Sequence, residues 1–207
     1  MSIRLGVHVD SRELAALGDK RLRGAFVRAM QKAGSTALRD MKSEANKRVR
    51  ARKRIKVKFI SRSFHLRRPR GSGNVIDGKE WALDVRGNRV SLTAYPHRQT
   101  KIPKGPQSRR SKRPGGVSVE VNRGKRTLIK GAFIATMKSG HQGVWIRQGA
   151  GRLPIRELLA SRPVDALLHK GEAEGVSERG GRSFGATFTR LLPMELDKVK
   201  AKGGGAG

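Results

Sequence analysis

Residues 130–156 have the sequence KGAFIATMKSGHQGVWIRQGAGRLPIR, a largely apolar segment in a chain that is otherwise rich in lysine and arginine. Residues 131–137 are apolar at both alternating sets of positions, which predicts a strand covered on both faces. The glycine-bounded residues 139–143 predict a turn, and residues 144–147 a second short strand. Residues 153–155 are expected to be extended, because proline disfavours helix at the residue before it.

A β-hairpin is predicted over residues 81–94. Apolar residues occupy every second position on both sides of Gly87-Asn88, a dipeptide that suits a two-residue turn. All the apolar side chains would then lie on one face of the hairpin. The predicted pairs are Val85 with Val90, Leu83 with Leu92, and Trp81 with Ala94.

Other strands are predicted on either side of this hairpin. Residues 3–9 alternate apolar and polar side chains, and residues 55–59 alternate apolar with basic ones, which indicates a strand with a cationic face. Residues 117–121 form a further alternating run, and a turn at residues 122–124 leads back into a strand over residues 127–137. Because the connections are mostly short, the strands predict a largely antiparallel sheet or a small sandwich.

Helices are predicted near both ends of the chain. Apolar residues recur every three or four positions from residue 19 to residue 49, so a long helix has one apolar stripe opposite an Arg- and Lys-rich face. A short helix is expected over residues 161–168. A C-terminal amphipathic helix is expected over residues 184–199, with Pro193 as a possible site of a kink.

These elements predict an α+β fold in which the N-terminal and C-terminal helices pack on the antiparallel sheet. We expect residues 1–200 to form a single domain and residues 201–207 a flexible glycine-rich tail. Two basic segments, residues 50–73 and 97–116, are expected to extend from that domain as arms. Both combine dense positive charge with glycine or proline, a composition typical of segments that order on assembly.

The charge of the chain indicates polyanionic or acidic partners. Lys and Arg number 47 against 16 Asp and Glu, a formal net charge of +31. Contacts of the basic segments with DNA would be independent of base sequence, because neither segment has a base-reading pattern. A membrane partner is not expected, since no apolar run approaches a transmembrane length. The candidate DNA- or partner-contact residues are Arg50, Arg52, Lys53, Arg54, Lys56, Arg67, Arg68, Arg70, Arg98, Lys101, Lys104, Arg109, Arg110, Lys112 and Arg113.

No enzymatic site is indicated. The five histidines are not at metal-ligand spacing, the carboxylates form no acid–base pair, and neither a P-loop nor a nucleophile elbow occurs. The absence of cysteine removes disulfides and thiolate metal sites, and fits assembly in a reducing cytosol. We therefore predict no catalytic residue, no metal and no cofactor.

The motifs GAFIAT (131–136), SGHQGVWIR (139–147) and RLPI (152–155) resemble the minor tail protein Z family of bacteriophages and prophages. The resemblance implies a virion structural protein, assembled in the host cytoplasm, that completes the tail at the neck, where tail and head join. It also implies a homohexameric ring that contacts a tail terminator or tube, the head connector and the end of the phage DNA. The alternative that the charge allows is a nucleic-acid-binding protein of ribosomal type.

Within the resembling segment, two interpretations remain open for most residues. Phe133 and Trp145 suit either the core or a subunit interface, and His141 suits a bond to backbone or to a neighbouring subunit. Arg147 is either an anchor for a carboxylate or a solvated side chain. The candidate interface residues are Phe133, His141, Trp145, Arg147, Leu153, Pro154 and Ile155.

Overall fold

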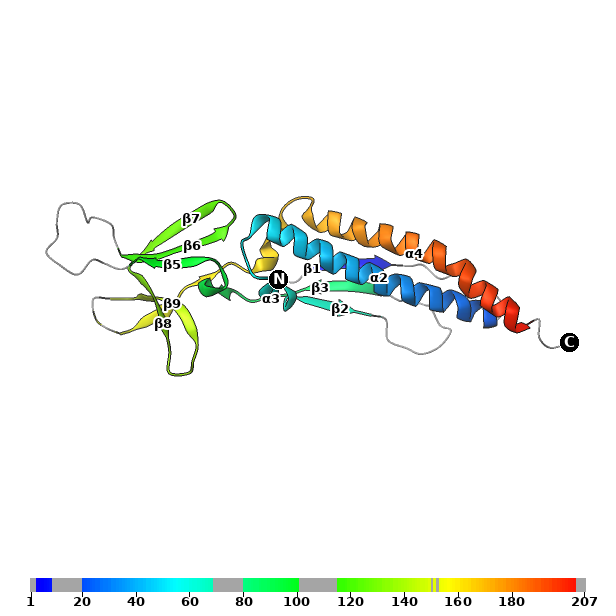
Figure 1. Cartoon of the computed structure of the whole chain (residues 1–207), viewed down its shortest axis with the longest axis horizontal. Coiled ribbons are helices and arrows are strands. Elements are labelled where there is room, and N and C mark those ends of the chain that lie inside the picture. The colour runs from blue at the N-terminus through cyan, green and yellow to red at the C-terminus, as the bar shows by residue number, and fades with distance from the viewer. Residues whose placement is uncertain are drawn as a thin grey trace. The chain divides into compact units, whose positions relative to one another are not determined.

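The computed structural model describes residues 3–8, 20–68, 80–100, 115–149, 151 and 153–203, with the backbone alone at residues 3–8, 80, 202 and 203 (Figure 1). The chain divides into two compact units. Unit 1 comprises residues 1–47, 64–86 and 167–207, and unit 2 comprises residues 48–63 and 87–166. The interpretation of residues 1–200 as a single domain stays a prediction.

Unit 1 consists of two long helices on a three-stranded sheet. The helices are α2 (Lys20–Arg52) and α4 (Glu172–Gly203), and they lie side by side and antiparallel along the sheet (Figure 1). The strands are β1 (Ile3–His8), β2 (Phe64–Arg67) and β3 (Glu80–Val85). Their order is β1-β3-β2 and both pairings are antiparallel. The predicted α+β class, with both helices packed on an antiparallel sheet, is confirmed.

The apolar stripe predicted for the N-terminal helix forms the buried face of α2. The side chains from Met30 onward, at intervals of three or four residues to Val49, are buried, whereas Leu22 and Phe26 near the start of the helix are half-buried. Helix α4 begins at Glu172, so it is longer than the predicted C-terminal helix and contains Pro193.

Close approach between the elements of unit 1 depends on two glycines. A Cβ added to Gly34 of α2 would lie 2.2 Å from Cε2 of Trp81, whose indole is 2% exposed in the central strand β3. A Cβ added to Gly180 of α4 would lie 2.5 Å from Cγ of Met41. Each missing side chain therefore leaves the space into which a large neighbour packs.

Polar contacts also connect the two helices of unit 1. The Glu195 carboxylate of α4, 4% exposed, accepts hydrogen bonds from Nε of Arg28 at 2.9 Å and Nζ of Lys32 at 2.7 Å, both on α2. It also accepts one from Nζ of Lys198 at 3.0 Å. These three cations lower the pKa of Glu195 to about 2, with Lys32 making the largest contribution. A single acid thus neutralises part of a strongly basic helix pair.

Unit 2 is built from short strands. Its two three-stranded sheets have the orders β5-β6-β7 and β10-β9-β8, while β4 pairs with β11, and every pairing is antiparallel. The strands are β4 (Val90–Ser91), β5 (His97–Thr100), β6 (Gly116–Asn122), β7 (Lys125–Lys130), β8 (Ala132–Thr136), β9 (Gln142–Arg147), β10 (Ile155–Glu157) and β11 (Leu159–Ala160). The helical segments are α3 (Val57–Ser61), the 3₁₀ helix η1 (Leu92–Ala94) and the 3₁₀ helix η2 (Pro163–Leu168), which lies at the predicted short helix.

The predicted hairpin over residues 81–94 is wrong. Strand β3 pairs with β1 and with the preceding strand β2, and not with the residues that follow it, while β4 pairs with β11. After β4 the chain enters η1, where Ser91 Oγ accepts a hydrogen bond from the Thr93 amide at 3.5 Å. The alternation was a true strand signal for residues 81–85, but alternation does not specify which strand is the partner.

Two other predicted strands also differ from the structure. Residues 55–59 do not form a strand, because Val57 begins α3, in which Ile60 is buried and Val57 is exposed. The strand expected over residues 127–137 is divided into β7 and β8 at Gly131, whose φ of +72° only glycine adopts easily. The two halves belong to different sheets.

The two basic segments expected to be arms are described only in part. Residues 50–68 pass through the end of α2, then α3 and β2, and residues 97–100 form β5. Residues 69–79, 101–114 and the terminal residues 204–207 lie outside the described residues. That these segments act as arms on assembly stays a prediction.

Candidate interaction surfaces

One face of the sheet formed by β8, β9 and β10 carries most of the predicted interface residues. Phe133, Trp145 and Glu157 form a row of directly paired positions across the three strands. Arg147 and Ile155 form the next row on the same face, because side chains two positions apart point the same way. We call this side of the sheet, with the adjoining Leu153-Pro154, the aromatic face.

The indole of Trp145 lies in the middle of the aromatic face and is held there by its nitrogen. Its Nε1 donates a hydrogen bond to the Ala135 carbonyl at 3.1 Å. A Cβ on Gly143 would lie 3.0 Å from this nitrogen and 2.9 Å from Glu157 Oε1, so glycine leaves room for both side chains. The His141 ring meets the indole edge-on, at 6.2 Å between centroids, and its Nε2 lies 2.9 Å from Glu157 Oε1.

Arg147 lies over the other aromatic ring of this face. Its Cζ is 5.5 Å from the centroid of the Phe133 ring, which is a cation–π arrangement. Its Nη1 donates to the Gly151 carbonyl at 3.4 Å, and the side chain is exposed. The structure thus shows a solvent-accessible arginine stacked on a ring, and no carboxylate of the described residues binds it.

The two faces of the β8-β9-β10 sheet are covered to different extents. On the opposite face Ala132 and Val144 are buried, and Ile134 and Ile146 are half-buried. On the aromatic face Phe133, Trp145 and Ile155 are only half-buried, and Leu153 beside them is 70% exposed. Within β8 only Ala132 is buried, while Ile134 on its face and Phe133 and Ala135 on the other are half-buried, so both faces are partly covered in the single chain. Complete cover of residues 131–137 on both faces stays a prediction.

The seven predicted interface residues are thus brought together at one sheet and the segment that precedes β10. Backbone hydrogen bonds fix the loops around it: Met137 N donates to the His141 carbonyl at 2.9 Å, and Gln148 N to the Pro154 carbonyl at 3.0 Å. Sequence reasoning missed Glu157, which binds His141, and Gly143. The strand register that places them on the aromatic face was the missing information.

The basic candidate residues fall into four groups. Lys53 is 6% exposed, and its Nζ donates to Ser161 Oγ at 2.6 Å and to the Arg162 carbonyl at 3.1 Å, so it is directed into unit 2. Arg54 binds Glu120 at 2.6 Å, and Arg67 binds Asp84 at 3.3 Å. The exposed remainder is Arg50, Arg52, Lys56, Arg68 and Arg98. Arg70, Lys101, Lys104, Arg109, Arg110, Lys112 and Arg113 lie outside the described residues.

Glu120, the acid that binds Arg54, is stabilised in its charged form. Glu120 accepts a hydrogen bond from the Gly124 amide at 3.1 Å, and this bond, with Arg54 and Arg126, lowers the pKa of the Glu120 carboxyl.

Within the described residues, no group of three or more His, Cys, Asp or Glu is placed to hold a metal ion. None of the described helices is long and apolar enough to span a membrane.

Comparison with models of known protein families identifies the family of this chain. The model of the prophage minor tail protein Z (GPZ) family matches residues 6–179, which include α2, all of the strands in unit 2 and the start of α4. The chain belongs to this family. As a minor tail protein Z it is a structural component of the phage tail, hence of the virion, and it interacts with other tail proteins. No curated protein and no solved structure matched the chain.

Proposed function

We propose that this minor tail protein Z forms a homohexameric ring at the neck, where it completes the tail and joins it to the head connector. The observation that carries the proposal is the half-exposed aromatic face in a chain whose family is shown over residues 6–179. The ring would assemble in the host cytoplasm and remain in the virion between the tail terminator or tube and the connector. The protein acts there by structure, with no catalytic step.

The aromatic face has the composition of a subunit interface. Tryptophan and arginine are the residues that most often dominate binding energy, and here Trp145 and Arg147 lie beside the exposed Leu153. A chain with a net charge of +31 repels its own copies, so association requires apolar burial of this kind. In a ring the contact is heterologous, so the face of one copy meets a different surface of the next copy.

The exposed basic residues provide a contact for the genome end. Positive side chains on Lys56, Arg68 and Arg98 are accessible, and the basic segments add further cations. Such contacts neutralise phosphates without reading bases, and therefore weaken as salt rises. The ribosomal-type alternative shares this chemistry but offers no reason for membership of a tail protein family.

Charge introduced into the aromatic face should dissociate the ring. We expect Leu153→Glu and, separately, Arg147→Glu to shift the nuclease-treated protein from hexamer to monomer. Both side chains are exposed, so the variants should fold and melt like the wild type. Native mass spectrometry and light scattering measure the assembly.

The matched control is Leu168→Glu, which places the same charge on an exposed leucine of η2 (46% exposed). This variant should remain hexameric. Equal dissociation by all three variants would show a general charge effect, and a ring that survives both aromatic-face variants would exclude this face as the subunit interface.

A further inference from the structure

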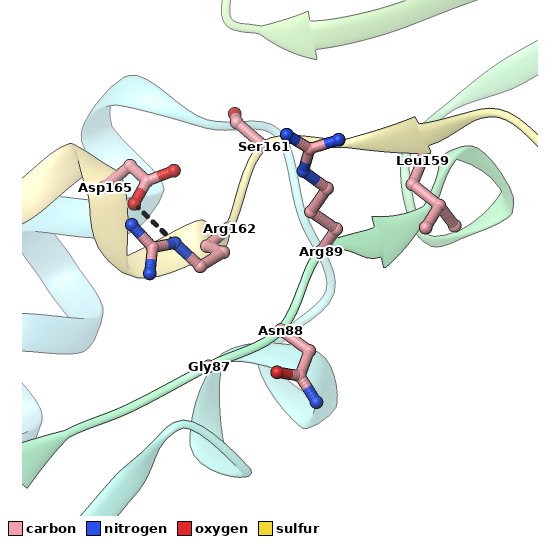
Figure 2. Close-up of a pocket in the computed structure, with 7 residues that line it drawn as sticks. All are labelled: Gly87, Asn88, Arg89, Leu159, Ser161, Arg162 and Asp165. Atoms are coloured by element: carbon pink, nitrogen blue, oxygen red, sulfur yellow. Dashed lines mark hydrogen bonds and ion pairs between the residues drawn. The ribbon is translucent and has the colours of Figure 1, made fainter. Parts of the chain in front are cut away.

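Unit 2 contains a pocket of about 550 Å³ that the proposed assembly does not use (Figure 2). Two chain segments form it: the loop that precedes β4, and the link that runs from β11 into η2. The residues that line it are Gly87, Asn88, Arg89, Leu159, Ser161, Arg162 and Asp165.

The two segments are fixed relative to one another. Strands β4 and β11 pair directly, Ser91 with Leu159 and Val90 with Ala160, at the edge of the pocket. Gly87 packs on Ser63, because a Cβ at this position would lie 2.8 Å from Ser63 Oγ. The pocket is therefore preorganised by pairing and packing, and its shape does not depend on a ligand.

Positive charge predominates in and behind the pocket wall. Arg89 is exposed, and among the described residues no hydrogen bond or ion pair engages its guanidinium. Figure 2 shows Arg89 extended toward Ser161, while the side chain of Asn88 points away from Ser161. Arg162 donates from Nε to Asp165 Oδ1 at 3.0 Å. Lys53 lies behind Ser161, so one carboxylate is set against three cations.

The contact with Lys53 also orients the Ser161 hydroxyl. A hydroxyl has a single hydrogen to donate, and Ser161 Oγ already accepts from Lys53 Nζ at 2.6 Å. Its own hydrogen is therefore available to a ligand that accepts hydrogen bonds. Burial lowers the pKa of the Lys53 ammonium, an effect that Asp165 opposes, and an anion in the pocket would likewise favour the charged lysine.

We propose that this pocket binds a phosphate group of the DNA backbone. The planar guanidinium of Arg89 suits the two non-bridging oxygens of such a group, and the Ser161 hydroxyl can donate a hydrogen bond to one of them. The fixed charges of Lys53 and Arg162 strengthen the attraction in a partly desolvated site. The inference rests on the proposed contact with the genome end, and it names one place on the protein where that contact is made.

The test uses nuclease-treated, full-length protein and two probes, inorganic phosphate and a short mixed-sequence DNA duplex. Inorganic phosphate should shift the backbone amide signals of Arg89 and Ser161 in a saturable titration. Arg89→Gln should abolish these shifts and weaken duplex binding by about fivefold, with the slope of affinity against salt reduced by about one. Arg156→Gln, which removes an exposed arginine from β10, should change neither result by more than about twofold.

The outcomes separate this inference from the proposed function. If duplex binding is the same in wild type and Arg89→Gln, the pocket assignment is overturned while a DNA contact elsewhere stands. If the wild type binds no duplex at low salt, the proposed genome contact fails and the assignment of the pocket to a DNA phosphate is overturned with it, whatever the inorganic phosphate titration shows. Weaker self-association of Arg89→Gln, without loss of duplex binding, would assign the pocket to a carboxylate of a partner and overturn the phosphate assignment.

Discussion

Replacing Gly34 with alanine should destabilise unit 1 by about 3 kcal/mol. The new methyl group would lie 2.2 to 2.4 Å from three atoms of the Trp81 indole. The indole is buried on the central strand β3, between β1 and β2, and its ring cannot flex as an aliphatic chain can. Helix α2 must therefore move away from the sheet, and this movement removes packing contacts along the apolar stripe of the helix. Urea denaturation followed by circular dichroism measures the change in the free energy of unfolding.

The matched control is Gly185→Ala in α4, where no described heavy atom lies within 4 Å of the added Cβ. That variant should gain about 0.5 to 1 kcal/mol, because alanine favours helix over glycine. Similar losses of stability in both variants would mean that glycine flexibility, and not the contact with Trp81, is what Gly34 supplies.

Removal of the Glu195 carboxylate should have the second largest effect, with Glu195→Gln costing about 2 kcal/mol at neutral pH. The glutamine keeps the shape of the side chain but leaves Arg28, Lys32 and Lys198 around a neutral amide. Repulsion among these cations then acts directly on the pairing of α2 with α4. Urea denaturation at neutral pH measures this difference.

The pH dependence of this difference follows from the lowered pKa of Glu195. The folded-state pKa is about 2 against an ordinary value of 4.5, so the folded state holds the acid deprotonated more strongly than the unfolded state does. The contribution to stability is present in full above the ordinary value and is lost as the pH falls from about 4.5 toward 2. The difference between wild type and Glu195→Gln should therefore disappear in acid.

The control for this pH series is Asp197→Asn, an exposed carboxylate two positions along α4. It should change stability by less than about 0.5 kcal/mol throughout the series. A wild-type advantage over Glu195→Gln that persists undiminished at the acid end would contradict the role assigned to the ion cluster.

Local periodicity was sufficient to predict some elements of this fold. The three- to four-residue spacing predicted helix α2, the alternation predicted strands β1 and β6, and these elements occur as predicted. The pairing of the strands was harder to predict from the sequence. Strand β3 pairs with residues 64–67 and residues 3–8, and no local pattern distinguishes these partners from the apparent hairpin partner at residues 90–94.

The candidate surfaces likewise include one part that the sequence could predict and one part that it could not. Residues 133–155 are close in sequence, so their gathering on one sheet was predictable from short strands and turns. The phosphate pocket was not predictable from the sequence, because it depends on the pairing of β4 with β11, which lie about seventy residues apart in the chain. The buried position of Lys53 was equally hidden, since its partner Ser161 lies on that distant link. A run of lysine and arginine gives no indication of which member points inward.

The most direct test of the central claim is cryo-electron microscopy of tails assembled with and without this protein. A six-fold ring of density is expected at the head-proximal end of complete tails, with the aromatic face of each copy against its neighbour. Tails that lack the protein should lack this ring and fail to join heads. Density at the distal tip, or isolated copies without ring contacts, would contradict a ring at the neck.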